Sequence, residues 1–240
     1  MGSLAAASRH GSRFLRKPAL SAACLGLAIF LIARPCFSGE RIVGNFGAGD
    51  LSGWTPKVFK GETSYSFVKE NGRTVLKAYS RSAASGLYKK IDLNPRNYPV
   101  LRWSWKIEHT IKNGNERTKA GDDYAARVYV VFPKTLFWKT RAINYIWANS
   151  LAMGASVPSA YTSNSMLVAV ESGNGRAGTW VDEERNIYDD YRKFFGEEPP
   201  LLGAVALMTD TDNTGEEAVA WYGDITLVSQ EAPRQNRAGK

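Results

Sequence analysis

The chain has 240 residues, of which 44% are hydrophobic and 22% charged, which excludes an intrinsically disordered protein and suits one globular domain with appendages. Its 31 basic and 23 acidic residues give a net charge of +8, but five basic and no acidic residues lie within the first 39 positions. The rest of the chain therefore carries only +3, which excludes the strongly basic surface typical of nucleic-acid binding.

The N-terminus has the layout of a secretory signal. Residues 13–17 are mostly basic, residues 19–33 form a mostly apolar run without charge, and Ser38 is a small residue suited to cleavage. The apolar run is shorter than the roughly 20 residues that a spanning helix needs. We therefore predict export to the periplasm or the cell exterior, with residues 1–38 removed as a signal or kept as an N-terminal anchor.

Cysteine and histidine are scarce in the rest of the chain. Both cysteines, Cys24 and Cys36, fall in the predicted signal, so the exported part has no disulfide, no thiol nucleophile and no cysteine-based zinc site. His10 also falls there, which leaves His109 alone and excludes a histidine-rich metal site. The exported part must therefore be stabilised by its hydrophobic core.

Short apolar or alternating segments, separated by turn residues, predict a series of β-strands. They cover 41–46, 65–69, 74–79, 86–93, 100–108, 125–132, 142–149, 166–171, 203–208 and 219–228. Asn71-Gly72, between the second and third segments, is a strong hairpin signal. Segment 100–108 alternates large apolar and polar residues, so one face packs in a core. In 125–132 both faces are largely apolar, and Arg127 is a cation there that needs an acidic partner.

One segment has helical periodicity. Within 183–195, Ile187 and Tyr191 recur on one face, Asp182 precedes them as a candidate cap, and Gly196 ends the pattern. The acidic residues at its start and basic residues at its end suit the helix dipole. We therefore predict a single short helix in the exported domain.

Nine to eleven strands with one short helix predict an all-β fold. The expected architecture is a two-sheet antiparallel β-sandwich of the jelly-roll type, which forms a single domain over 39–230. Residues 231–240 are a polar tail.

Four long stretches of the chain carry a family resemblance. They are 101–105 (LRWSW), 121–132 (GDDYAARVYVVF), 186–192 (NIYDDYR) and 208–215 (MTDTDNTG). Together they resemble the bacterial exported family DUF3047, a domain of unknown function, over about 42–228. The resemblance implies an exported single-domain protein without an assigned activity. The turn from Phe46 to Trp54, followed by strand pairs, is more distantly similar to galactose-binding-like and other carbohydrate-binding jelly rolls.

The loop 210–216 is rich in oxygen-bearing side chains. Asp210 and Asp212 match the first and third positions of an EF-hand, but Thr214 and Trp221 break the pattern at the fifth and twelfth positions, so an EF-hand is rejected. A generic calcium site that uses Asp210 and Asp212 stays open. The alternative is an Asx-type turn, in which these side chains accept hydrogen bonds from backbone N–H groups.

Asp122 and Asp123 directly precede the strand that holds Arg127. In one interpretation, one of them pairs with an acid from 210–216 as the acid and base of a glycosidase-type site. In the other, they are structural partners of Arg127 or Arg185. The distance between the two carboxylates decides whether a glycosidase mechanism works, and the sequence does not give that distance. We therefore favour the second interpretation.

The last predicted strand places two aromatic residues on opposite faces. Trp221 is in phase with Ile225 and Leu227, which predicts a core position. Tyr222 is then on the other face, where it would be exposed and available to stack on a sugar ring. Hydrogen bonds to the same ligand would come from Asn149, Arg185 and Asn213.

These features predict a non-catalytic binding domain of the cell envelope, with a saccharide or envelope glycan as ligand. The expected ligand-binding residues are Asp122, Asp123, Arg127, Asn149, Arg185, Asp210, Asp212, Asn213 and Tyr222. We expect no cofactor beyond calcium, no nucleic acid, and membrane contact only through an uncleaved N-terminal anchor. A carboxylate-dependent glycan hydrolase or lyase and a structural or protein-binding envelope protein are the alternatives.

Overall fold

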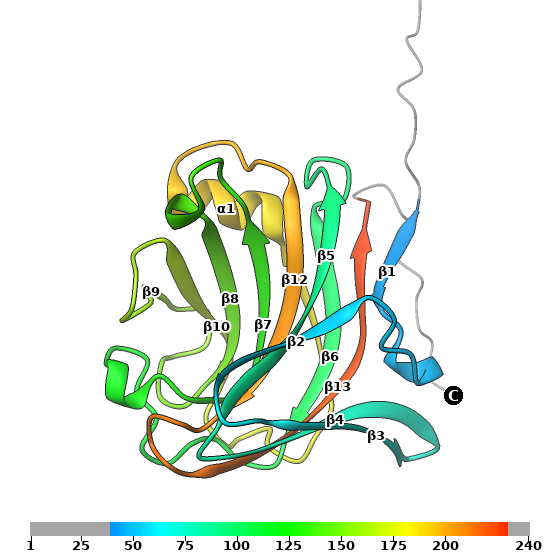
Figure 1. Cartoon of the computed structure of the whole chain (residues 1–240), viewed down its shortest axis with the longest axis vertical. Coiled ribbons are helices and arrows are strands. Elements are labelled where there is room, and N and C mark those ends of the chain that lie inside the picture. The colour runs from blue at the N-terminus through cyan, green and yellow to red at the C-terminus, as the bar shows by residue number, and fades with distance from the viewer. Residues whose placement is uncertain (1–38, 230–240) are drawn as a thin grey trace, which may run out of the picture. The chain divides into compact units, whose positions relative to one another are not determined.

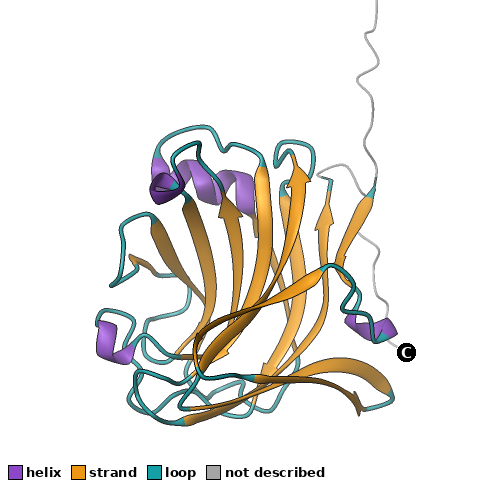
Figure 2. Cartoon of the chain, viewed as in Figure 1, coloured by secondary structure: helices purple, strands orange, loops and turns teal. Residues whose placement is uncertain are grey.

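A computed structural model describes residues 39–229, so the predicted signal or anchor and the polar tail lie outside the described residues. The described chain forms thirteen strands, one α-helix and three short 3₁₀ turns (Figure 1, Figure 2). No helix within this part is long and apolar enough to cross a membrane.

The strands form two sheets, which confirms the predicted two-sheet all-β sandwich. One sheet has the order β11 (Val181–Asn186), β6 (Val100–Ile107), β13 (Glu217–Val228), β4 (Arg73–Arg81) and β3 (Ser64–Glu70), with β1 (Glu40–Gly44) also paired to β13. The other has the order β2 (Trp54–Lys60), β5 (Ala84–Leu93), β12 (Leu202–Asp210), β7 (Tyr124–Phe132), β8 (Arg141–Ala148), β10 (Ser165–Ser172) and β9 (Ser156–Pro158).

The prediction that all strands run antiparallel is wrong for one pair. β8 and β10 are parallel, because the chain between them returns through a crossover that contains β9. Parallel neighbours cannot be joined by a tight hairpin and need such a connection. Three strands are missing from the prediction. They are β9, which has three residues, β2, whose residues after Trp54 are all exposed, and β11, most of which was predicted as helix.

One hydrophobic core fills the space between the sheets. The alternating residues of β6 enter it as predicted, with Trp103 and Trp105 packed edge to face at 5.4 Å between ring centroids. Val128 and Val130 of β7 face them from the other sheet. Because both sheets and this core are built from described residues, 39–229 contain all that the sandwich needs to fold.

The predicted helix is half right. The helix α1 spans Ile187–Phe195, while the preceding residues 181–186 pair as a strand with β6. The helix cap is Asn186, whose side chain accepts a hydrogen bond from the Asp189 backbone N–H, and the predicted cap Asp182 lies inside β11. Edge pairing with β6 therefore outweighs the helical spacing in the first half of the segment.

The predicted exposure of Tyr222 is also wrong. Tyr222 pairs with Trp105 and Ile225 with Trp103, so β13 has one extra residue there and its side-chain phase reverses. A Cβ on Gly223 would lie 2.1 Å from the Ser104 hydroxyl, so a larger residue at this bulge requires that hydroxyl to rotate away. Tyr222 is fully buried and donates a hydrogen bond to the Met208 carbonyl, whereas Trp221 is partly exposed.

An acidic side chain faces inward at the edge of the six-stranded sheet. Glu183 of β11 pairs with Trp103 and accepts a hydrogen bond from Trp105 Nε1 at 3.2 Å. Burial, and then the nearby carboxylate of Glu171, raise the pKa of Glu183 to about 7. Glu171 is itself buried and paired with Arg176.

This carboxyl makes stability depend on pH. The folded state keeps the Glu183 proton up to about pH 7, whereas an unfolded glutamic acid loses it near ~4.3. The folded state therefore binds more protons in this window, and the free energy of unfolding falls as pH rises through it. We expect Glu183→Gln to flatten this part of the pH profile, measured by urea unfolding, and to be more stable than the parent at pH 8. The exposed neighbour change Asp182→Asn is the control; equal profiles for both variants and the parent would contradict the assignment.

Candidate functional site

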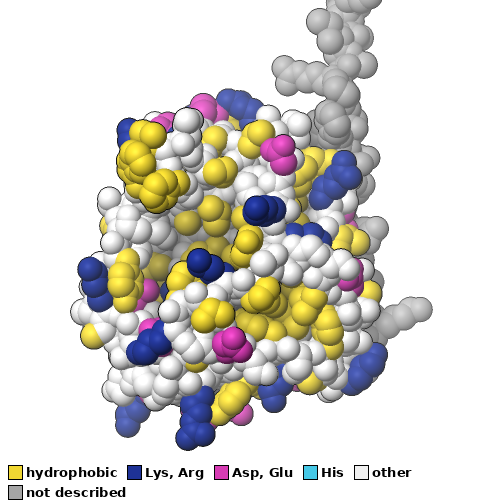
Figure 3. All heavy atoms as spheres, in the orientation of Figure 1, with side chains coloured by type: hydrophobic (Ala, Val, Ile, Leu, Met, Phe, Trp, Pro, Cys, Tyr) yellow, Lys and Arg dark blue, Asp and Glu magenta, His cyan; other side chains and the backbone are white. Residues whose placement is uncertain are grey.

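The outer face of the seven-stranded sheet is open only in part. Over β8 and β10 it is covered by Leu151 and Val157, which pack on the buried residues Ile146, Ala148, Leu167 and Ala169. In Figure 3 this face is hollowed over β7, β8 and β12, and hydrophobic side chains line the hollow. Along β7, Val128 and Val130 point into the core, so Arg127, Tyr129 and Val131 point to this outer face. We call this region the outer-face hollow.

Cross-strand pairing fixes the residues of the hollow. Tyr88 of β5, Ala206 of β12, Tyr129 of β7 and Asn144 of β8 stand in one row across the sheet. The neighbouring row has Ala204 on β12. Alanine side chains are short, so β12 forms the floor between the tyrosines on either side.

Tyr129 lies along the sheet. Its ring is partly exposed, and its hydroxyl contacts Sδ of Met208 at 3.7 Å, one row away on the same face. Burial of the hydroxyl raises the pKa of Tyr129, so this group stays protonated. The Arg127 guanidinium carbon lies 5.6 Å from the centroid of this ring, so the part of the ring that stays exposed is a candidate stacking surface beside a cation.

Two buried polar atoms of the hollow have no hydrogen-bond partner among the described residues. Asn144 is 2% exposed and its Oδ1 is unpartnered, and Arg127 is 5% exposed with an unpartnered Nε. Such atoms are rare in folded proteins because each one loses its hydration without compensation. Five other buried side-chain atoms of the described residues lack a partner as well, so these two atoms suggest a ligand site only together with the partly exposed ring of Tyr129.

The other guanidinium nitrogens of Arg127 are occupied. One bonds the carboxylate of Asp210, and the other lies 3.6 Å from Asp122 Oδ2. Burial raises the pKa values of both acids, and the Arg127 charge opposes that rise. The prediction of an acidic partner for Arg127 is confirmed. Of the two arginines proposed for Asp122, the structure selects Arg127.

Asp123 holds the loop 210–216 in place. Its carboxylate accepts hydrogen bonds from the backbone N–H groups of Asn213 and Thr214, at 3.1 and 2.7 Å, and from the Thr214 hydroxyl at 2.7 Å. The Asn213 side-chain amide donates a further bond at 3.1 Å. The sequence predicted that carboxylates of the loop itself would accept hydrogen bonds from loop N–H groups. Such hydrogen bonds are present, but the acceptor is Asp123, which lies in the segment before β7.

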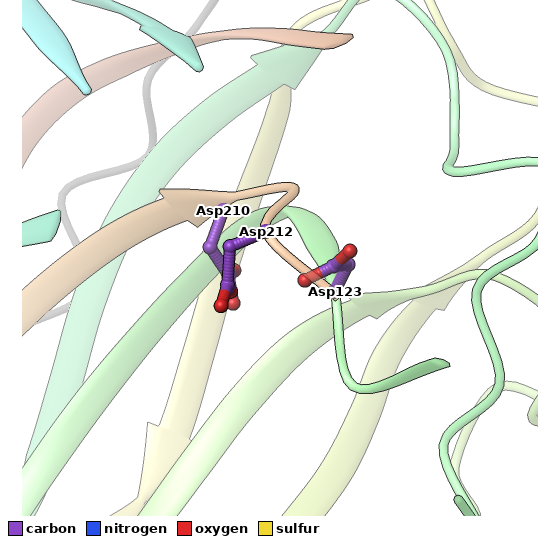
Figure 4. Close-up of side chains that lie close together, drawn as sticks. All are labelled: Asp123, Asp210 and Asp212. Carbon is purple, nitrogen blue, oxygen red and sulfur yellow. The ribbon is translucent and has the colours of Figure 1, made fainter. Parts of the chain in front are cut away.

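The contacts of three aspartates decide how well calcium would fit. Oxygen atoms of Asp123, Asp210 and Asp212 lie within 4.8 Å of one another (Figure 4). However, the Asp123 oxygens already accept four protein donors, and Asp210 faces a guanidinium. Calcium takes six to eight oxygen ligands, which include waters and carbonyls, and it needs carboxylate charge that Arg127 already offsets at Asp210. The donor set therefore does not suit a calcium ion, and it favours the turn interpretation.

The structure gathers six of the nine residues expected from sequence. Asp122, Asp123, Arg127, Asp210, Asp212 and Asn213 lie together where β7 begins and β12 ends. Asn213 Oδ1 also accepts a hydrogen bond from the exposed Tyr161 hydroxyl at 3.0 Å.

The remaining three residues have other roles. Asn149 binds the Ile111 N–H and the Asp123 carbonyl and so fastens the loop before β7. Arg185 lies in the other sheet, where it forms a two-bond ion pair with Asp190. Tyr222 belongs to the core.

The sequence prediction did not include Tyr88, Tyr129 or Asn144. Tyr129 could have been found because it shares the outward phase of Arg127, two residues along β7. Asn144 is a lone amide within an apolar, aromatic segment, which is itself a signal. Tyr88 has no comparable signal, since only the pairing of distant strands brings it to this row.

We expect Asp123→Asn to destabilise the domain by ~2–3 kcal/mol. An NH₂ group then stands where a carboxylate oxygen accepts hydrogen bonds from several loop groups, and those hydrogen bonds are lost. Urea unfolding at pH 7 measures the change. The matched control Asp182→Asn, on exposed β11, should leave the free energy of unfolding nearly unchanged. A neutral Asp123→Asn would show that this carboxylate does not hold the loop.

We expect calcium to leave thermal stability unchanged. Melting curves of residues 39–229 in calcium chloride and in EDTA should superimpose, because protein donors already bind the three aspartates. A melting temperature that rises with calcium, and that no longer does so in Asp212→Asn, would instead assign a calcium site to this loop.

Comparison with solved structures finds sandwiches of remote similarity. A family 30 carbohydrate-binding module of a cellulosomal cellulase from Clostridium thermocellum is 11% identical, with 75% of this chain and 92% of that chain covered and a TM-score of 0.41. The xylan-binding CBM22-1 domain from Paenibacillus barcinonensis is 13% identical, covering 81% and 99%, with a TM-score of 0.38. A cleaved adhesin domain of Lys-gingipain from Porphyromonas gingivalis is 15% identical, covering 79% and 100%, with a TM-score of 0.38. Likenesses at this level carry no conclusion about ligands.

No curated protein matches the chain. The family described as "Protein of unknown function (DUF3047)" matches residues 52–226, which includes every strand of the seven-stranded sheet and the loops around the outer-face hollow. The chain therefore belongs to the DUF3047 family.

Proposed function

We propose that this protein is an exported, non-catalytic domain that binds a saccharide or envelope glycan in the outer-face hollow. The observation that carries the proposal is the Tyr129 ring, which lies along the sheet beside the two buried unpartnered atoms, Asn144 Oδ1 and Arg127 Nε. Export rests on the charge and hydropathy pattern of residues 1–38.

The chemistry of a sugar ring matches these groups. Its C–H-bearing face can stack on the exposed face of Tyr129, and the ordered ring loses little entropy on binding. A sugar hydroxyl can donate to Asn144 Oδ1 and accept from the Arg127 Nε–H. Both contacts would satisfy atoms that are otherwise desolvated without a partner. Tyr88 and Tyr161 add partly or well exposed rings at the sides.

The contacts of the carboxylates support binding over hydrolysis. A glycosidase needs one carboxyl to donate a proton and a second carboxylate free to act on the sugar or on water. Here the Asp123 carboxylate already accepts hydrogen bonds from several protein groups, and the Asp210 carboxylate forms an ion pair with Arg127. A binding site needs neither carboxylate to be free.

The proposal is tested by screening residues 39–229 on an array of envelope and plant glycans, followed by titration of the best binder. We expect Tyr129→Ala to weaken binding at least tenfold, or about 1.4 kcal/mol, because the stacking surface is lost. Tyr129→Phe keeps that surface and should bind like the parent. Tyr79→Ala, which removes an exposed ring from β4 in the other sheet, is the control for general loss of aromatic surface.

Three results would count against the proposal. The first is a folded parent that binds no glycan, which would favour the protein-binding alternative and lead to co-purification from the envelope. The second is equal loss in Tyr129→Ala and Tyr79→Ala, which would place the ligand elsewhere. The third is release of shortened glycan during the assay, which would favour the hydrolase alternative.

A further inference from the structure

A short loop between β7 and β8 exposes three consecutive large apolar side chains. Leu136 is 41% exposed, Phe137 79% and Trp138 60%. They belong to the turn η3 (Phe137–Lys139) and the residue before it, at the end of the sandwich where β7 ends. Figure 3 shows hydrophobic side chains gathered over this loop. We call residues 136–138 the η3 tip.

The η3 tip is held in one conformation although it is exposed. The N–H groups of Lys139 and Thr140 donate to the carbonyls of Leu136 and Phe137 at 2.8 and 3.0 Å. The side chain of Asn164 donates to the Trp138 carbonyl at 2.8 Å. The two aromatic rings meet edge to face, 5.1 Å apart. The tip is therefore preorganised, and binding there would cost little conformational entropy.

Positive charge surrounds the tip. Lys134 and Arg141 flank it on either side and share a single carboxylate, that of Glu197. Lys139 is exposed and has no salt-bridge partner among the described residues. The flanks thus carry more positive than negative charge, which suits a partner with negative groups at its surface.

The shape of the tip limits its partner. Two aromatic side chains bury about 150–250 Å² each, so the tip falls well short of the ~800 Å² per partner that a stable protein interface needs. A tip that projects from the domain does not fit a flat surface, but it can enter a fluid one. Aromatic residues with flanking lysines are favoured where lipid tails meet charged head groups.

We infer that the η3 tip inserts into the head-group region of a membrane that contains anionic lipids, as a membrane contact separate from any N-terminal anchor. Phe137 and Trp138 enter the interface, while Lys139 and the excess charge of Lys134 and Arg141 attract the anionic head groups. The inference does not depend on saccharide binding.

Vesicle sedimentation with residues 39–229, which lack the N-terminal apolar run, tests the inference. We expect the parent to sediment with vesicles of phosphatidylglycerol and phosphatidylcholine, less with phosphatidylcholine alone, and less again at high salt. The double variant Phe137→Ser with Trp138→Ser should lose at least tenfold in vesicle affinity while its melting temperature stays the same. Lys139→Glu should lose affinity for the anionic vesicles only. Phe59→Ser, which removes a ring that is 66% exposed on β2, is the matched control and should sediment like the parent.

Failure of the parent to bind anionic vesicles would overturn the inference, and so would equal sedimentation of the parent and the double variant. A concentration-dependent dimer of the parent that the double variant does not form would assign the tip to a second copy and also overturn it. Loss of glycan affinity in the double variant without loss of vesicle affinity would assign the tip to the outer-face hollow.

Discussion

The buried ion pair between Arg127 and Asp210 is the interaction on which the arrangement of the outer-face hollow depends. It joins the start of β7 to the end of β12, next to a register shift between Met208 and Asp210. Two buried charges cost several kcal/mol to desolvate, so their net contribution to stability is small, but removing one partner costs ~3–5 kcal/mol. The pair therefore acts mainly by fixing which residues of the two strands face each other.

The position of the loop after β12 follows from that pairing. Once β12 ends at Asp210, the next residues reach the Asp123 carboxylate, which was brought there by the start of β7. Asn213 then meets Tyr161 from the loop between β9 and β10. Three loops distant in sequence are thus fastened at one end of the outer-face hollow. Arg127 Nε and Asn144 Oδ1, two of the buried atoms without a partner among the described residues, belong to strands under this hollow.

The residue pattern of a single segment predicted the fold well for strands with one face buried in the core. The alternation in β6 and the isolated cation in β7 were sufficient to predict a core face and a buried ion pair. The pattern failed where the answer depends on a distant partner. The extra residue in β13 that buries Tyr222 is visible only against β6, and residues 181–186 form a strand only because β6 offers an edge. The hydrogen bonds from the loop 210–216 to the Asp123 carboxylate join residues about ninety positions apart, and no local sequence pattern predicts them.

The edges of the seven-stranded sheet have a consequence for solubility. At one edge β9 has only three residues and ends in Pro158, which has no N–H to donate, and at the other β2 contains Pro56 with Lys57 and Lys60 beside it. Short strands, prolines and lysines at an edge oppose strand addition by another chain. A sheet with an apolar hollow on its open face is a template for fibril growth if its edges are free. With these edges blunted, the protein can keep that face uncovered at high local concentration without polymerising.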